Sequence, residues 1–286
     1  MSENIFHFQD IKKPYLIAEI GINHNGDISF VKRMIDFAVV FGWDCVKFQK
    51  RNPKLSVPEH QKNVMRETPW GKITYLDYRY KVEFNKEQYD EIARYSFNKI
   101  DFAASVWDID SVDFISNYKV PYIKVPSAHL TNDDLIHHIC KKKKPVLLST
   151  GMSTIEEVDH AVEIMKNYSD NFALLHTVST YPAHENELNL KVIPELQKRY
   201  NCVVGYSGHE FGLIPSVIAV AMGAKIIERH VTLNRTLWGT DQMASVEPQG
   251  MLKLIAQIRA TEEALGDGIK RVHDSELPTR KKLRGY

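Results

Sequence analysis

The stretch Ile-Ile-Glu-Arg-His-Val, residues 226–231, decides the fold when it is compared with Tyr-Ser-Gly-His-Glu, residues 206–210. In each, a histidine ends an apolar run of β-forming residues: His230 closes the first run, and His209 follows residues 202–206. In neighbouring strands of one parallel sheet, both imidazoles would meet at the carboxyl edge, where such sheets carry their chemistry. Two imidazoles with nearby oxygen ligands suit a divalent transition ion. The pattern therefore predicts a metal site at a sheet edge, and two hydrogen-bonded loop histidines are the alternative.

Eight short apolar runs alternate with helical patterns along the chain. The expected strands are residues 15–19, 45–49, 100–105, 122–125, 145–149, 172–177, 202–207 and 226–231. The expected helices are residues 27–41, 86–97, 110–118, 132–142, 153–167, 190–200, 213–222 and 249–265. The strands are almost continuously apolar, as in a sheet covered on both faces. Strict alternation predicts an α/β fold, a (β/α)8 TIM barrel, in a single domain of residues 1–286. A doubly wound sheet is the alternative, but no Gly-x-Gly-x-x-Gly follows the first strand.

Two helix starts carry capping signals. Asp27 stands directly before the first expected helix, and its carboxylate can accept from the first free backbone N–H groups. Ser153 and Glu156 have the spacing of a capping box, which would open the fifth helix. Gly42 is expected to end the first helix.

The composition is that of a globular protein without a strong electrostatic field. Hydrophobic residues make up 43% of the chain and the net charge is +1, so neither nucleic acid nor an anionic membrane is expected as a partner. No apolar run approaches the ~20 residues of a membrane span, and the N-terminus lacks the order of a signal peptide. Cys45, Cys140 and Cys202 are too widely spaced for a metal pair or a disulfide framework. We therefore expect a cytoplasmic location.

Residues 50–80 interrupt the alternation after the second strand. They are rich in Pro, Lys and aromatic residues and have no clear hydrophobic period, which indicates an insertion. A lid over the site is one expectation, with Gly71 as a hinge, and a subunit contact in a homodimer is the other. The side chains suited to stacking or to pairing with acidic groups are Trp70, Tyr75, Tyr78, Tyr80, Arg66 and Arg79. Residues 266–286 are expected to form a short C-terminal tail, which is basic in residues 277–286.

Polar side chains gather where the expected strands end. They are Glu19, Lys47, Gln49, Ser105, Lys124, Ser127, Ser149, Thr150, Thr177, Ser179, Tyr181, Ser207, His209, Glu228 and His230. In a barrel these ends meet at one mouth. Burying a lone ammonium is costly, so Lys47 and Lys124 predict an anion pocket, most simply for phosphate. A Schiff base on one lysine is the alternative, but the nearby histidines and serines favour phosphate with a metal. Asp241 and Gln242 follow the last strand and can reach the same mouth, although an exposed loop aspartate is the simpler alternative.

Five motifs resemble those of the sialic acid synthase family. They are Ala-Glu-Ile-Gly-Ile-Asn-His-Asn-Gly at 18–26, Val-Lys-Phe-Gln at 46–49, Ser-Thr-Gly-Met at 149–152, Tyr-Ser-Gly-His at 206–209 and Glu-Arg-His-Val-Thr at 228–232. They stand in the family's order, between about residues 15 and 265. The resemblance implies a transferase that condenses phosphoenolpyruvate with a sugar aldehyde, giving a 2-keto-3-deoxy sugar acid and phosphate. It covers the catalytic barrel, and the antifreeze-like C-terminal domain of many members is not expected because the chain ends at Tyr286.

The resemblance also implies roles for the matching positions. Phosphoenolpyruvate would be bound by Lys47, Ser105, Lys124, Ser127, Ser149 and Ser207. A divalent cation, Mn²⁺ or Mg²⁺, would be held by His209 and His230. The open-chain sugar or the attacking water would contact Glu19, Gln49, Tyr181 and Asp241, with Glu19 as the choice for activating the water.

Two positions depart from the family pattern. His129 stands where a sugar-binding Glu is usual, and Ser179 stands where Asn is usual, so the sugar need not be N-acetylmannosamine. Another metal-dependent or Schiff-base barrel aldolase or lyase acting on a keto acid is the first alternative. A sugar-binding barrel without turnover is the second, although such a protein would not need both lysines and both histidines.

Overall fold

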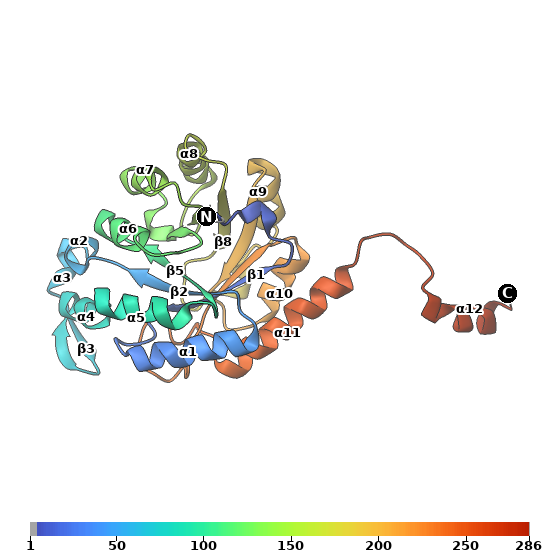
Figure 1. Ribbon diagram of the computed structural model, residues 1–286, viewed down its shortest axis with the longest axis horizontal. Coiled ribbons are helices and arrows are strands. Elements are labelled where there is room, and N and C mark those ends of the chain that lie inside the picture. The colour runs from blue at the N-terminus through green and yellow to red at the C-terminus, as the bar shows by residue number, and fades with distance from the viewer. Residues whose placement is uncertain (1–4, 286) are drawn as a thin grey trace.

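The computed structural model of the chain describes residues 5–285. Residues 1–4, part of the N-terminus scanned for a signal, and Tyr286, the end of the expected tail, lie outside the described residues. Parallel strands close into a barrel in the order β1-β10-β9-β8-β7-β6-β5-β2 (Figure 1). They are β1 (Tyr15–Gly21), β2 (Cys45–Lys50), β5 (Asp101–Val106), β6 (Ile123–Val125), β7 (Val146–Ser149), β8 (Phe172–Thr177), β9 (Val203–Gly208) and β10 (Ile226–His230).

A layer of helices surrounds the barrel of strands. The helices are α1 (Ile28–Phe41), α5 (Lys86–Ser96), α6 (Ile109–Ser116), α7 (Asp133–Lys141), α8 (Ile155–Lys166), α9 (Val192–Tyr200), α10 (Ile214–Ala221) and α11 (Pro248–Leu265). The outward-facing strand residues and the inner helix faces form one continuous apolar cluster. The predicted (β/α)8 TIM barrel is confirmed, and each strand and helix agrees with its expected bounds to within two residues.

The capping signals had different outcomes. Asp27 accepts from the backbone of Ser29 as expected, and Gly42 ends α1 with a left-handed φ of 86°. The capping box of α8 was predicted one residue too early: it is formed by Thr154 and Glu157. Ser153 instead donates its hydroxyl to the carbonyl of Gly151 at 3.2 Å. Both residue pairs have the same spacing, so the sequence could not separate them.

The interior of the barrel is divided into an apolar floor and a polar top. The floor side chains are Ile17, Cys45, Ala103, Tyr122, Leu147, Ala173, Leu175 and Ile226. A short 3-10 turn, η1 (Phe8–Asp10), brings the buried Phe8 ring beneath this layer, 5.8 Å from the ring of Tyr122. Strand side chains alternate, so the next inward residue lies two positions further on. Those residues are Glu19, Lys47, Ser105, Lys124, Ser149, Thr177, Ser207 and Glu228.

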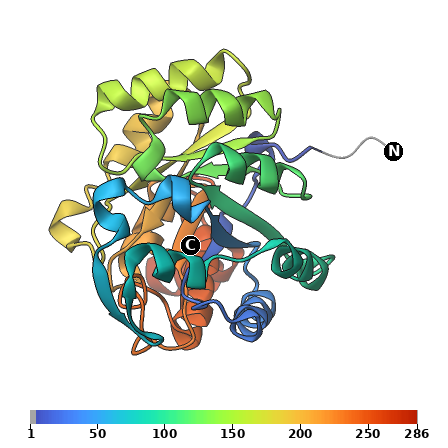
Figure 2. The ribbon, with the colours of Figure 1, turned by 90° about the vertical axis from the view of Figure 1, so that its left-hand side faces the viewer.

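Residues 50–80 form a folded segment, which we call the cap. The sequence of this segment has no clear hydrophobic period and therefore did not predict its helices and strands. It consists of α2 (Pro53–Ser56), α3 (Glu59–Lys62), the antiparallel hairpin β3 (Met65–Thr68) and β4 (Gly71–Thr74), and the start of α4 (Tyr75–Val82). Tyr78 and Val82 of α4 pack on Ile22 beyond β1 and on Trp238 beyond β10. Gly71, with φ 92°, lies at the hairpin turn and not at a junction with the barrel. Figure 2 shows the cap on the near face of the molecule.

The C-terminal residues extend away from the barrel on the side opposite the cap (Figure 1). They contain η4 (Asp274–Glu276) and the basic helix α12 (Leu277–Arg284), and their side chains are almost all exposed. Within residues 5–285, no helix combines the length and the apolar character needed to cross a membrane.

Candidate active site

Strand pairing places the polar top residues at one level. Glu19 of β1 is paired with Lys47 of β2 on one side and with His230 of β10 on the other. Glu228 of β10 is paired with Ser207 of β9. The expected site residues buried at the mouth are Glu19, Lys47, Ser105, Lys124, Ser149, Ser207, His209 and His230. Those less buried are Gln49, Ser127, His129, Ser179 and Asp241, and Tyr181 is exposed.

Glu228 lies at the centre of the buried charges; the sequence placed it at the mouth but did not pair it with the lysines. Its carboxylate is 3.2 Å from Lys124 Nζ and 3.6 Å from Lys47 Nζ, and it accepts from the Ser207 hydroxyl at 3.0 Å. Burial alone would raise the pKa of this carboxyl, but the ammonium groups of Lys124 and Lys47 outweigh it and lower the pKa to about 2. A further sequence signal is its place two residues before His230, on the same face of one strand.

The two lysines differ in their electrostatic surroundings. Lys47 lies 2.6 Å from Glu19 and donates to Ser105 at 2.9 Å. Burial works to lower the pKa of Lys47, but Glu19 and Glu228 prevail and raise it. At Lys124 burial prevails over Glu228 and lowers the pKa to about 8. Both lysines therefore have carboxylate partners, and the two ammonium and two carboxylate charges are balanced before an anion enters.

A niche lined by hydroxyl groups lies beside this cluster. Gly151 donates its backbone N–H to the Ser127 hydroxyl at 3.1 Å. A Cβ atom at Gly151 would lie 2.8 Å from Ser127 Oγ and even closer to Ser179 Oγ, so the glycine leaves room where these hydroxyls converge. Ser149 is buried two residues earlier at the end of β7. Hydroxyl and backbone donors of this kind suit an oxyanion.

His209 and His230 lie side by side, with ring centroids 5.4 Å apart. His209 Nδ1 is 2.7 Å from the carbonyl oxygen of Val178. Since a carbonyl only accepts, Nδ1 carries the proton and Nε2 is left as the free nitrogen. Burial, with the neighbouring His230, lowers the pKa of His209 to about 3, so its imidazole is neutral. Tyr181 covers the pair, with its ring 4.1 Å from that of His209.

The histidine pair has the donor chemistry that a divalent cation needs. His230 Nδ1 is buried without a hydrogen-bond partner, and Asp241 Oδ2 is 3.8 Å from it. A neutral imidazole with a free nitrogen is a ligand for Mn²⁺-type ions. Within residues 5–285, no three His, Cys, Asp or Glu side chains are grouped as a ready ligand set. Two protein ligands would leave further positions to water and substrate oxygens.

Gly21 allows three of the expected site residues to approach one another. Its φ is 56°, and a Cβ atom there would lie 3.1 Å from Glu19 Oε1, 3.2 Å from Gln49 Nε2 and 3.5 Å from His230 Cε1. Gln49 also donates to Glu19 Oε1 at 3.4 Å. The carboxylate of Glu19 therefore lies between the lysine cluster and the histidine pair.

The sequence interpretation was wrong for Gln242 and did not identify Trp107. Gln242 does not reach the mouth, because it is fully buried. Its side-chain oxygen accepts a hydrogen bond from the Thr232 hydroxyl at 2.5 Å, and its side-chain nitrogen donates to the Asn23 carbonyl at 3.1 Å. These hydrogen bonds of Gln242 hold the loop that carries Asp241 against Thr232 and Asn23. His129 is half-buried, with its ring 5.3 Å from that of Trp107, which the sequence did not identify.

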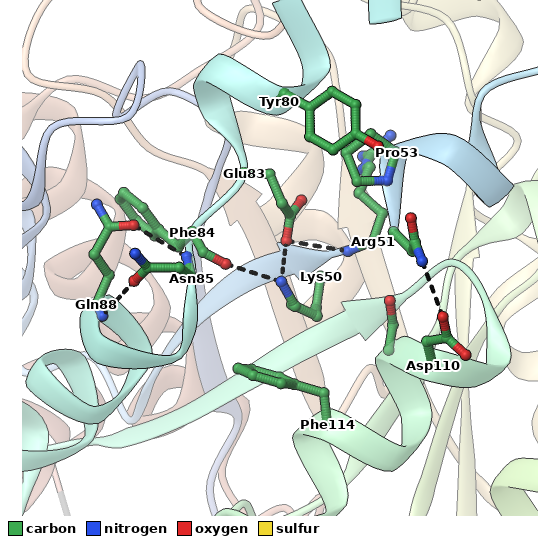
Figure 3. Close-up of a pocket in the computed structure, with 12 residues that line it drawn as sticks. Lys50, Arg51, Pro53, Tyr80, Glu83, Phe84, Asn85, Gln88, Asp110 and Phe114 are labelled. Atoms are coloured by element: carbon green, nitrogen blue, oxygen red, sulfur yellow. Dashed lines mark hydrogen bonds and ion pairs between the residues drawn. The ribbon is translucent and has the colours of Figure 1, made fainter. Parts of the chain in front are cut away.

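Pockets flank the mouth on two sides. One, of about 550 Å³, is lined by Lys50, Arg51, Tyr80 and Glu83, and Lys50 is paired with Glu83 at 2.6 Å (Figure 3). Another, of about 560 Å³, lies between α8 and α9 and touches the mouth through Thr177. Neither pocket is lined by the two buried lysines of the mouth, by Glu228 or by the His209–His230 pair, so the barrel mouth is the candidate site on the grounds of its chemistry.

Comparisons with known proteins show the family of the chain. Residues 34–270 match the model of the NeuB family. The chain is 39% identical to N-acetylneuraminate-9-phosphate synthase of Homo sapiens over 94% of this chain and 76% of the relative. It is 36% identical to N,N'-diacetyllegionaminic acid synthase of Campylobacter jejuni over 93% of this chain and 81% of the relative. The crystal structure of the N-acetylneuraminic acid (sialic acid) synthetase from Leptospira borgpetersenii is 32% identical, with a TM-score of 0.84, over 96% of this chain and 94% of that chain.

Proposed function

The chain belongs to the NeuB family, and we propose that this enzyme condenses phosphoenolpyruvate with a sugar aldehyde, giving a 2-keto-3-deoxy sugar acid and phosphate. The observation that carries the proposal is the arrangement of Lys47 and Lys124 around Glu228, next to His209 and His230, in one barrel mouth. The relatives named above are synthases of sialic and legionaminic acids, which supports the same class of product.

Phosphoenolpyruvate has two anionic groups, and the polar top offers donors for both. We assign its phosphate and carboxylate to Lys47, Ser105, Lys124, Ser127, Ser149 and Ser207. Charge-assisted contacts from the two ammonium groups would supply most of the binding energy. Because Glu19 and Glu228 already balance the lysines, a cation at the histidines would help to offset the incoming negative charge.

The reaction forms one C–C bond and breaks one C–O bond. The enol carbon of phosphoenolpyruvate attacks the aldehyde carbon, and the aldehyde oxygen takes up a proton. Water then adds to the electron-poor carbon that carries the phosphate and loses a proton. The resulting tetrahedral centre expels phosphate as its hydroxyl group loses a second proton, which leaves the keto group. A Mn²⁺ or Mg²⁺ ion held by His209 and His230 would polarise the aldehyde oxygen as a Lewis acid.

Glu19 is our choice for the group that takes the proton of the attacking water. Its carboxylate lies in the mouth between Lys47 and Gln49, and Gly21 leaves the space above it open. Gln49, Tyr181, His129 and Asp241 are assigned to the sugar, since they form the outer part of the mouth. Ser179 is assigned to both substrates, because it shares the niche at Gly151 with Ser127.

Phosphate release tests this function directly. The protein is incubated with phosphoenolpyruvate, Mn²⁺ and a panel of aldoses, and inorganic phosphate is followed. Lys47→Ala and Lys124→Ala should each raise the KM for phosphoenolpyruvate roughly tenfold or more, because each removes a charge-assisted contact worth ~1.5–3 kcal/mol. Lys253→Ala, on the exposed face of α11, is the control. If no aldose stimulates phosphate release, or if all three variants behave alike, the assignment is wrong.

A Schiff-base aldolase is the second candidate, favoured by one observation. Burial lowers the pKa of Lys124 to about 8, which makes its neutral, nucleophilic form more accessible. Borohydride in the presence of pyruvate would then reduce an imine and add a stable mass to the protein. We expect no such adduct, because Glu228 holds the Lys124 ammonium at 3.2 Å.

A further inference from the structure

Two arginines from the rim and the cap lack a carboxylate partner. Arg51 is only 6% exposed, and its Nε is buried without a hydrogen-bond partner. Arg79, on α4, has a buried Nη1 that also lacks a partner. Neither takes part in any ion pair found among residues 5–285. Burying a guanidinium in this way is costly unless something else supplies the opposite charge.

Arg51 continues the row of inward-facing residues that climbs along β2. Cys45 lies in the floor, Lys47 in the charged cluster and Gln49 at the rim, so Arg51 is the next position on that face. It donates to Gln49 Oε1, and its guanidinium lies 3.8 Å from the centroid of the Trp107 ring. Figure 3 shows its side chain running beside Pro53 and Tyr80, in a different direction from Lys50. Arg51 therefore contacts Gln49 at the rim and also lines the pocket beside the mouth.

Arg79 is held on the cap side of the same region. Its Nε donates to the Tyr75 hydroxyl at 2.8 Å, and its neighbour Tyr78 packs against Trp238 at 5.0 Å. Arg51 lines a pocket together with Tyr80, the residue that follows Arg79 in α4, so the two arginines belong to one region (Figure 3). Burial first, and then the positive charge of Arg79, lowers the pKa of Arg51 to about 10. Glu83 accepts from the backbone N–H of Arg51 at 3.3 Å, but its carboxylate is paired with Lys50 at 2.6 Å. Asp241 lies 3.8 Å from His230 and forms no ion pair with either arginine.

We propose that Arg51 and Arg79 form a subsite for a phosphate group carried by the sugar substrate, at the end remote from its aldehyde. This inference rests on the proposed function. Gln49 joins the two regions, since it donates to Glu19 and accepts from Arg51. The subsite thus lies two inward-facing side chains beyond Lys47 along β2, with Gln49 between them, and it serves the second substrate.

The chemistry favours a phosphate monoester over an uncharged sugar. Guanidinium forks match phosphate oxygens in shape, and two of them can share one dianion. Sugar hydroxyl groups would leave both cations without opposite charge. The Trp107 ring fixes the plane of the Arg51 fork, so less side-chain entropy is lost when the anion binds.

Matched sugar pairs test the subsite. Phosphate release is measured with N-acetylmannosamine and mannose, each with and without a 6-phosphate, and with mannuronate as a carboxylate at the same carbon. The 6-phosphates should be preferred in kcat/KM by about tenfold or more, as expected for charge-assisted contacts. Arg51→Gln and Arg79→Gln should each reduce that preference roughly tenfold, and Arg51→Lys should restore part of it. Arg94→Gln, exposed on α5, is the control and should keep the preference.

Equilibrium binding separates the subsite from the reaction. Calorimetry with N-acetylmannosamine 6-phosphate should show tighter binding than with N-acetylmannosamine, and Arg51→Gln should remove the difference. If the protein turns over the uncharged sugars equally well, or if mannuronate alone is preferred, the phosphate subsite is wrong while the proposed function stands. If no sugar supports phosphate release, the proposed function fails, and the binding difference still decides whether the anion subsite exists.

Discussion

At the scale of single residues, the barrel mouth is governed by charged side chains that lie a few ångströms apart. Glu228 touches both lysines, so neither ammonium is free in the absence of substrate. The two lysines differ in which effect prevails. At Lys124 burial outweighs the attraction of the carboxylates and lowers the pKa to about 8. At Lys47 the carboxylates outweigh burial and raise the pKa. Of the two lysines, Lys124 is therefore the one that loses its charge within the accessible pH range.

This difference predicts the pH dependence of phosphoenolpyruvate capture. The ammonium of Lys124 is present below about pH 8 and is lost above it, so kcat/KM for phosphoenolpyruvate should fall as the pH rises through 8. The effect on stability has the opposite sign: the folded pKa is lower than the unfolded one, so the cost of burying the charge declines above pH 8. In Lys124→Arg the fall should disappear, since a guanidinium stays charged. A wild-type profile that is level to pH 10 would contradict this assignment.

The histidine pair predicts a requirement for a divalent cation. His230→Ala should abolish turnover and leave the circular dichroism spectrum and the thermal unfolding unchanged, because His230 Nδ1 makes no hydrogen bond within the protein. Chelator should abolish the activity of the wild type, and added Mn²⁺ should restore it. His160→Ala, exposed on α8, is the control. Full activity in excess chelator would remove the cation from the mechanism.

At the scale of elements, the cap and the loop after β10 meet through aromatic side chains. Tyr78 is buried against Trp238, and Trp70 of the β3–β4 turn lies 6.4 Å from the same ring. Asn25 donates to the Trp238 carbonyl at 2.9 Å, which ties the loop to the end of β1. The cap is therefore joined to the mouth at its outer edge, where a sugar would extend from the phosphoenolpyruvate site.

These contacts predict a role for the cap in binding the sugar. Trp70 is 38% exposed, so part of its ring is available for stacking on a ligand. Trp70→Ala should raise the KM for the sugar several-fold, by loss of a stacking contact of about 1 kcal/mol, and should change the KM for phosphoenolpyruvate little. Phe97→Ala, an exposed aromatic residue beyond α5, is the control. Equal effects on both KM values would indicate that Trp70 acts only by supporting the cap.

For the whole molecule, stability resides in the closed barrel and not in the C-terminal extension. The Phe8 ring seals the floor and is 1% exposed, whereas residues 266–285 are almost entirely exposed. Phe8→Ala should lower the free energy of unfolding by about 3–5 kcal/mol, as for other buried aromatic residues. A chain truncated after Leu265 should unfold within about 2 °C of the full chain. Urea and thermal unfolding would measure both changes, and a large loss on truncation would show that the extension packs on the barrel.

The sequence alone determined the barrel and most of the residues at its mouth, although Gln242 proved to be buried outside it. Eight apolar runs alternating with helical patterns admit few folds, because each strand must be covered on both faces. Once the fold is a barrel, residues at the strand ends must share one mouth, so Lys47, Lys124, His209 and His230 could be placed together without coordinates. The sequence could not decide between Ser153 and Thr154 as the N-cap of α8, because each is followed by a glutamate three residues later. It also could not predict the elements of the cap, whose residues have no clear hydrophobic period.

Only the tertiary structure decided which of these groups are partners. Glu228 meets Lys124 across 104 residues of sequence, and Arg51 lies over Trp107, because barrel closure and strand register bring those side chains to one level. Ionic contacts depend on differences of about one ångström, which residue types and spacing do not contain. The pairing of the lysines, the orphaned nitrogens of Arg51 and Arg79 and the burial of Gln242 therefore became visible only when strands distant in the chain were placed side by side.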